Sequence, residues 1–80
     1  MSREEVITIL TPLAQVAFRR SDLIITDDLS GQNLETWTSL AFTQFIGAVE
    51  KQFGFKFKLV ELFTLRNMGA IIDSIVAHVS

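Results

Sequence analysis

The chain contains no cysteine and no tyrosine, and its 80 residues include one proline and one histidine. Without cysteine it can form neither a disulfide nor a thiolate metal site. The single histidine, His78, has no second ligand at metal-binding spacing, so we expect a surface side chain there. No apolar run approaches the ~20 residues of a membrane-spanning helix, and the first five residues are unlike a signal peptide. These absences favour a cytoplasmic protein with neither a membrane span nor a bound metal.

The middle third of the chain lacks lysine and arginine, although the net charge of the whole chain is only −2. Between residues 21 and 50 every charged side chain is acidic, namely Asp22, Asp27, Asp28, Glu35 and Glu50. Nucleic acids are bound by basic groups, so this region argues against a nucleic-acid partner. The acids suit a basic protein surface, through electrostatic steering, as well as they suit a plain solvated loop. With 49% apolar and 20% charged residues, we expect one globular domain, residues 1–80, acting as a monomer.

The first predicted helix covers residues 4–18, where apolar side chains recur at spacings of three and four. Ser2 and Glu5 have the spacing of a capping box at its start. Pro12 lacks a backbone donor and crowds the preceding turn, so we expect it to kink the helix or restart it, with Thr11 able to cap. A long ordered loop should follow from residue 19 to residue 38, pinned to the bundle by Leu29, Leu34 and Trp37.

Residues 39–53 form the strongest helical pattern, with Thr38 as the N-cap and Gly54 at the C-terminal cap. Three elements should follow: an extended connector at 55–59 that buries both of its phenylalanines, a brief helical turn at 59–63, and a last helix from the N-cap Asn67 to about Val79. The predicted core joins Leu10, Leu13, Phe45, Val49, Phe53, Ile72 and Ile75. The fold class is therefore all-α, with three main helices, one short helix and a long loop between the first two helices.

The spacing of several short motifs resembles the acyl carrier protein family. Trp37-Thr38-Ser39-Leu40 opens the second helix, and Phe53-Gly54 follows fourteen and fifteen residues after the serine. In that family an Asp-Ser-Leu triplet opens the second helix, and its serine bears 4′-phosphopantetheine. Asn67-Met68-Gly69 also resembles the start of the family's final helix. The resemblance spans nearly the whole chain and implies an acyl-carrier-like bundle.

The resemblance implies that Ser39 is the covalent attachment site, flanked by Thr38 and Leu40. The prosthetic group would come from coenzyme A through a phosphopantetheinyl transferase, and the other partners would be acyl-loading and acyl-processing enzymes. Trp37, two residues before the serine, gives the motif a resemblance to the Trp-Asp-Ser-Leu motif of carriers in specialised polyketide, peptide and lipid pathways. Thr38 stands where the family has an aspartate that helps the transferase place its substrate and metal. Retention as an unmodified interaction module is the alternative.

The chemistry of a helix start suits this role. Unpaired amides and the positive dipole end favour a phosphate at Ser39. No base lies near Ser39 in the sequence, so a hydrolase is not indicated. A second serine, in Asp73-Ser74-Ile75, copies the family triplet but lies inside the last predicted helix, which argues against it. The sequence therefore predicts a carrier without catalysis of its own.

Three further residues are candidates for partner or cargo contact. Thr43 and Gly47 lie one turn apart, on the side of the helix that carries Ser39, and have little apolar bulk. We expect a groove there that runs toward Leu62 in the short third segment. A close helix crossing at Gly47 explains that glycine nearly as well.

Overall fold

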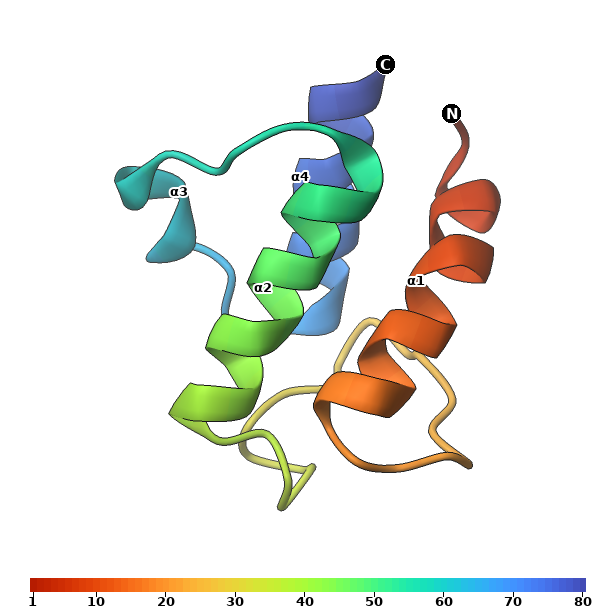
Figure 1. Ribbon diagram of the computed structural model, residues 1–80, viewed down its shortest axis with the longest axis vertical. Helices are drawn as coiled ribbons and strands as arrows, with labels where there is room; N and C mark the ends of the chain where they lie inside the picture. The colour runs from red at the N-terminus through yellow and green to blue at the C-terminus, as the bar shows by residue number, and fades with distance from the viewer.

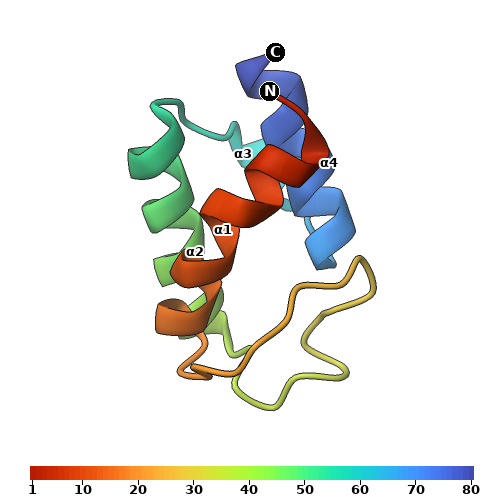
Figure 2. The ribbon, with the colours of Figure 1, turned by 90° about the vertical axis from the view of Figure 1, so that its right-hand side faces the viewer.

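The structure is a computed structural model that describes residues 1–80, and it contains four helices and no strand. The helices are α1 (Arg3–Ala17), α2 (Ser39–Phe53), α3 (Leu59–Leu62) and α4 (Met68–Val79). Figures 1 and 2 show α1 packed across α2 and α4, with the short α3 set to the side of α2. The long loop from α1 to α2 crosses the lower end of the bundle. The expected all-α fold is confirmed, and none of the helices is long and apolar enough to cross a membrane.

The predicted capping box of α1 is present. The hydroxyl of Ser2 accepts from the Glu5 amide at 3.1 Å, and the Glu5 carboxylate accepts from the Ser2 amide at 2.9 Å. The restart of the helix expected as one possibility at Pro12 is wrong, because α1 runs unbroken through this residue. Pro12 is exposed, so water can solvate the carbonyl that the missing amide leaves free. Thr11 does not cap, since its hydroxyl donates instead to the Ile7 carbonyl at 2.7 Å.

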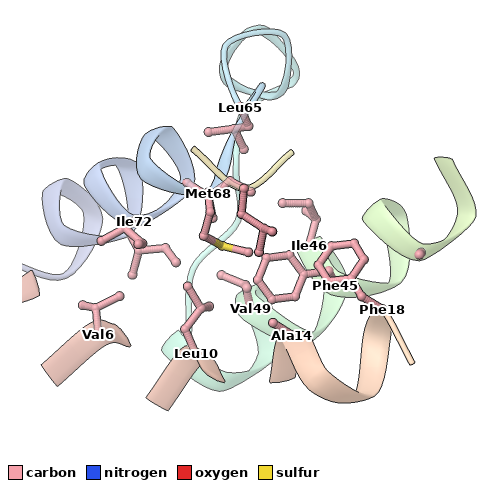
Figure 3. Close-up of a cluster of buried hydrophobic side chains, with 14 of the residues drawn as sticks. Val6, Leu10, Ala14, Phe18, Phe45, Ile46, Val49, Leu65, Met68 and Ile72 are labelled. Carbon is pink, nitrogen blue, oxygen red and sulfur yellow. The ribbon is translucent and has the colours of Figure 1, made fainter. Parts of the chain in front are cut away.

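The core lies between the three long helices (Figure 3). Phe45 and Val49 of α2 are fully buried, as are Leu10 of α1 and the isoleucines of α4 that were predicted to meet them. Leu13 and Phe53 lie at the edge of the core, half-buried and packed against it. Phe18, just after α1, is also fully buried and was not predicted. The buried set is Val6, Leu10, Ala14, Phe18, Leu23, Leu29, Leu34, Ala41, Phe45, Ile46, Val49, Phe57, Leu65, Met68, Ile71, Ile72 and Ile75.

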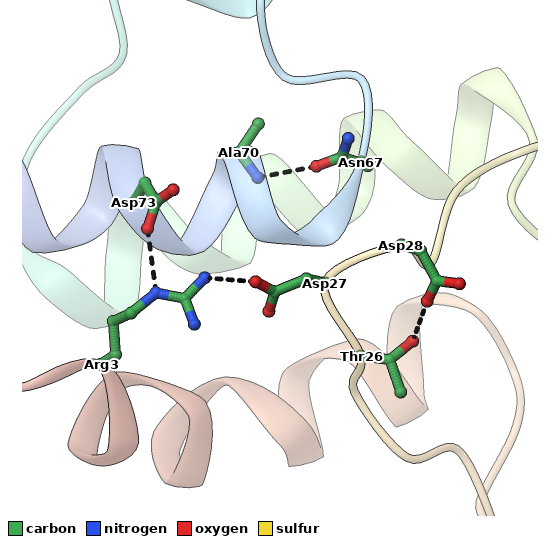
Figure 4. A network of polar contacts seen from close by, with 7 residues as sticks. All are labelled: Arg3, Thr26, Asp27, Asp28, Asn67, Ala70 and Asp73. Atoms are coloured by element: carbon green, nitrogen blue, oxygen red, sulfur yellow. Dashed lines mark hydrogen bonds and ion pairs between the residues drawn. The ribbon is translucent and has the colours of Figure 1, made fainter.

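The long loop is held by backbone hydrogen bonds to the start of α4. The Met68 amide donates to the Leu29 carbonyl at 2.8 Å, and the Gly69 amide donates to the Asp27 carbonyl at 2.9 Å. Arg3 of α1 completes the junction by pairing with Asp27 at 3.0 Å and with Asp73 of α4 at 2.9 Å (Figure 4). Leu29 and Leu34 are buried and Trp37 packs against the core, so the predicted anchoring of the loop is confirmed.

The connector between α2 and α3 is extended, and it buries Phe57 and half-buries Phe55. The Phe57 amide donates to the Glu50 carboxylate at 2.8 Å, which ties the connector to the last turns of α2. His78 lies at the surface end of α4, yet its ring stacks on Phe55 with centroids 4.2 Å apart. Nε2 of the same ring is 2.7 Å from a carboxylate oxygen of Glu61, which attaches α3 to α4.

Candidate functional site

Ser39 is the first residue of α2, and its side chain is exposed. Its hydroxyl takes part in none of the hydrogen bonds of the protein, and the amides of Ser39 and Leu40 have no acceptor within the chain. Thr38 is the N-cap, as predicted, and its hydroxyl accepts from the Ala41 amide at 3.1 Å. The start of α2 therefore presents a free hydroxyl beside two free backbone donors.

A hollow of about 430 Å³ opens beside Ser39. Its walls come from the end of the long loop, the first turns of α2, and the segment from α3 to α4. The lining residues are Trp37, Thr38, Ser39, Phe42, Thr43, Leu62, Leu65 and Arg66. Half of them are apolar, and none carries a carboxylate or an imidazole. The hollow can therefore hold a chain of mixed polarity, and it offers Ser39 no general base.

Stacked aromatic rings support one wall of the hollow. The indole of Trp37 stacks on the ring of Phe42 with centroids 6.0 Å apart, and on the buried Phe18 with centroids 4.7 Å apart. Phe18 in turn lies 5.2 Å from Phe45 in the core. Aromatic pairs of this kind contribute about 0.5–1.5 kcal/mol beyond their buried area. The stack fixes the residue that precedes Thr38 and so holds the start of α2 in place.

The start of α2 lies within a segment that matches a known family. A family model described as the phosphopantetheine attachment site matches residues 13–75, which include Ser39 and make up most of the 80-residue chain. The chain belongs to this phosphopantetheine-binding family. Its structure is similar to the solution structure of a holo acyl carrier protein from Geobacter metallireducens, with a TM-score of 0.82 and 28% sequence identity, and the match covers 89% of this chain and 82% of that one. Curated proteins gave no match to the sequence.

The resemblance to acyl carrier proteins is thereby confirmed, and the prosthetic group of this carrier is 4′-phosphopantetheine. When bound, the group supplies a terminal thiol on which acyl chains travel as thioesters. The start of α2 fits the phosphate end of the group. The hydroxyl of Ser39 is free, two amides lack acceptors, and no carboxylate lines the hollow to repel an anion.

The structure brings two of the predicted contact residues to Ser39. Thr43 and Leu62 both line the hollow, and the Thr43 hydroxyl donates to the Ser39 carbonyl at 2.9 Å. Leu40 is 66% exposed and faces away from the hollow, into a neighbouring depression that it shares with Arg19 and other residues. Thr43 and Leu62 therefore share the space beside the serine, whereas Leu40 offers an apolar side chain to the outside.

Gly47 lies outside the hollow. It lines a second, open depression together with the end of α2 and the connector, among them Glu50 and Phe55. A Cβ atom built on Gly47 meets nothing within 4 Å. The close helix crossing considered for this glycine is therefore wrong, and of the groove expected from Thr43 and Gly47 toward Leu62 only the part between Thr43 and Leu62 lies in the hollow. Ser74, the rival serine, is half-buried inside α4, where no helix start surrounds it.

Two residues that line the hollow, Phe42 and Arg66, were not predicted as site residues from the sequence. Phe42 lies three residues before Phe45, so its spacing is equally typical of the apolar core face of α2, yet it is half-buried and lines the hollow. Arg66 was not singled out at all. It follows α3 with no acid three or four residues away in either direction, so a missing ion-pair partner was the only signal that the sequence held.

Proposed function

We propose that Ser39 carries the 4′-phosphopantetheine arm and that the protein delivers thioester-linked acyl or aminoacyl intermediates to partner enzymes. The observation that supports this most is the place of Ser39: a free, exposed hydroxyl at the first residue of α2, within the matched family segment. Residues 1–80 would act as one domain and as a monomer in the cytoplasm.

The residues around Ser39 suit presentation rather than catalysis. Thr38 caps α2 and fixes the direction in which the serine leaves the helix, while the Thr43 hydroxyl is already occupied by the Ser39 carbonyl. The imidazole of His78 is engaged with Glu61 and the connector phenylalanines, away from the hollow. No acid, base and nucleophile lie together at one place, so nothing supports a catalytic activity of the protein itself.

A dedicated pathway for specialised lipids, polyketides or peptides is favoured over bulk fatty-acid synthesis. In the carriers of fatty-acid synthesis, the second helix bears several acidic side chains. Partner enzymes bind these acidic side chains. In α2 the single acid is Glu50, and its carboxylate is bonded to the Phe57 amide, while Lys51 adds a positive charge beside it. Partners of this carrier would therefore depend less on acidic groups of α2 than those of fatty-acid carriers do.

One observation favours the second candidate, an unmodified interaction module. Thr38 provides the helix cap that an aspartate would provide, but not the negative charge that the family offers to the transferase's metal. The intact mass of the protein, measured after incubation with coenzyme A and a broad-specificity phosphopantetheinyl transferase, distinguishes the two functions. The carrier gains the mass of one phosphopantetheinyl group and then accepts an acyl group on its thiol. An unchanged mass under conditions that prime a reference carrier completely would favour the interaction module.

A further inference from the structure

Arg66 is the one charged residue that lines the hollow beside Ser39. Two of the other three arginines have carboxylate partners: Arg3 pairs with Asp27 and Asp73, and Arg20 pairs with Asp22, whereas Arg19 has none. Arg66 forms no ion pair, and the only hydrogen bond of its guanidinium is a long one, 3.5 Å from Nε to the Phe63 carbonyl. Most of its donors are therefore free to bind a ligand in the hollow.

The polar groups that share the hollow with Arg66 do not compete for it. Thr38 Oγ1 accepts from the Ala41 amide, and the Thr43 hydroxyl donates to the Ser39 carbonyl. Thr38 is uncharged where the family has an acid, so no carboxylate lines this hollow; the Asp28 carboxylate borders a separate depression that Arg66 also lines, and it forms no ion pair with Arg66. On the other side of Thr38, Arg19 lines a separate depression that does not include Ser39.

We propose that Arg66 binds the phosphodiester of the group carried by Ser39 and thereby holds the first part of the arm in the hollow between α2 and α3. The proposal rests on the proposed attachment at Ser39. A guanidinium presents its N–H donors in a planar fork that matches two oxygens of one phosphate, and a phosphodiester has two non-bridging oxygens to offer. Threonine in place of the family's aspartate at position 38 suits this contact, because an acid there would compete with the phosphate for Arg66.

The same contact would give the arm a starting direction. From a phosphate held by Arg66, the arm would begin between the rings of Trp37 and Phe42 and the side chain of Leu62, which line the hollow. The hollow is open, so this contact restrains the first atoms of the arm and leaves its thiol end mobile. The contact is therefore compatible with any cargo on the thiol.

The test compares the apo and holo proteins by NMR, after intact mass has shown that priming is complete. Two signals are followed: the ³¹P resonance of the phosphodiester, and the Nε–Hε cross-peak of Arg66. The variants are Arg66→Gln, which removes the charge, and Arg66→Lys, which keeps the charge but loses the planar fork. Arg19→Gln is the matched control, since it removes an exposed arginine from the other side of Thr38.

On priming, the Arg66 cross-peak should shift and its Hε should exchange more slowly with water, whereas the Arg19 cross-peak should not move. The ³¹P resonance of holo Arg66→Gln should differ from that of the wild type, Arg66→Lys should fall between them, and Arg19→Gln should match the wild type. In 1 M salt, where the screening length is about 3 Å, the wild-type resonance should move toward the Arg66→Gln position.

Two outcomes would overturn the proposal, and they differ. Fully primed wild-type and Arg66→Gln proteins with superimposable ³¹P resonances would refute the Arg66 contact and leave the attachment at Ser39 intact. A wild-type protein that gains no mass, or that gains it at another residue, would refute the proposed function and the Arg66 contact together.

Discussion

The Gly69 amide donates to the Asp27 carbonyl at 2.9 Å, and Asp27 lies so close to Gly69 that a side chain at position 69 would be crowded. A Cβ atom built on Gly69 lies 3.0 Å from the Asp27 Cβ and 3.1 Å from the Asp27 carbonyl oxygen. The close contact with the long loop therefore favours glycine in the first turn of α4. This contact also holds the loop across the end of the bundle, on the way to the start of α2.

Gly69→Ala should lower stability by about 1–2 kcal/mol, because overpacking against backbone atoms outweighs the better helix propensity of alanine. The matched substitution is Gly47→Ala, where a Cβ meets nothing within 4 Å. There the propensity gain acts alone, and the melting temperature should rise by about 4–8 °C for a gain near 1 kcal/mol. Thermal unfolding of both variants checks the pair, and shifts of the same sign would contradict this account of the two glycines.

Phe45→Ala should be poorly folded. The Phe45 ring is fully buried and contacts Phe18, and removing such a ring costs about 3–5 kcal/mol, a large share of the stability of a small domain. Lys56→Ala is the control, since Lys56 is exposed on the connector and makes no ion pair. Its melting temperature should stay close to that of the wild type. Equal melting temperatures for the two variants would show that the face of α2 is assigned wrongly.

The attachment of α3 to α4 should weaken in acid. The His78 ring bonds the Glu61 carboxylate and, with the Lys58 amide, holds the pKa of Glu61 below its usual value, although partial burial opposes this. Because the pKa is lower in the folded protein than in the unfolded chain, the stabilisation is complete above the unfolded pKa of about 4.3 and is lost as the pH falls through the folded pKa.

Glu61→Gln should therefore lower the melting temperature at about pH 7, and this difference should shrink as the pH falls through the folded pKa of Glu61, where the wild-type carboxylate becomes protonated as well. Glu4→Gln serves as the control, because Glu4 is exposed and its carboxylate makes no hydrogen bond. Melting curves across this pH range decide the matter. A difference between wild type and Glu61→Gln that does not change with pH would exclude the carboxylate–imidazole bond as its source.

Thr38→Asp should speed priming without changing the fold. Aspartate caps a helix about as well as threonine, and its negative charge is favourable near the N-terminus of α2. The added carboxylate would also provide the charge that the family offers to the transferase's metal. Initial rates of phosphopantetheine transfer to the two proteins, at matched concentrations, give the comparison. Slower priming of Thr38→Asp would mean that the native transferase prefers the uncharged residue.

The parts of the fold that depend on local signals could be predicted from the sequence. Thr38, Gly54 and Asn67 cap their helices where expected, because a cap depends on a few neighbouring residues. The effect of Pro12 could not be predicted, since it depends on whether the orphaned carbonyl reaches water. The two helical glycines show the same limit: only the distance to Asp27 distinguishes the constrained Gly69 from the open Gly47.

Part of the candidate site could also be predicted from local signals, and part could not. The place of Ser39 at a helix start was predictable, since the spacing to Phe53-Gly54 and the cap at Thr38 both mark it. The hollow beside it was only partly predictable, because residues from the loop, α2 and the segment after α3 meet there through tertiary packing. Arg66 is far from Ser39 in the sequence, and no local pattern connects the two.

The central claim is that Ser39 is the residue that carries the arm, and mapping the modified residue tests it most directly. Wild-type, Ser39→Ala and Ser74→Ala proteins would be incubated with coenzyme A and the transferase, weighed intact, and fragmented to locate the added group. Ser74→Ala is the control because Asp73-Ser74-Ile75 copies the family triplet inside α4. We predict one phosphopantetheinyl group on Ser39 in the wild type and in Ser74→Ala, and none in Ser39→Ala. A group that persists in Ser39→Ala, or that maps to another serine in the wild type, would contradict the account.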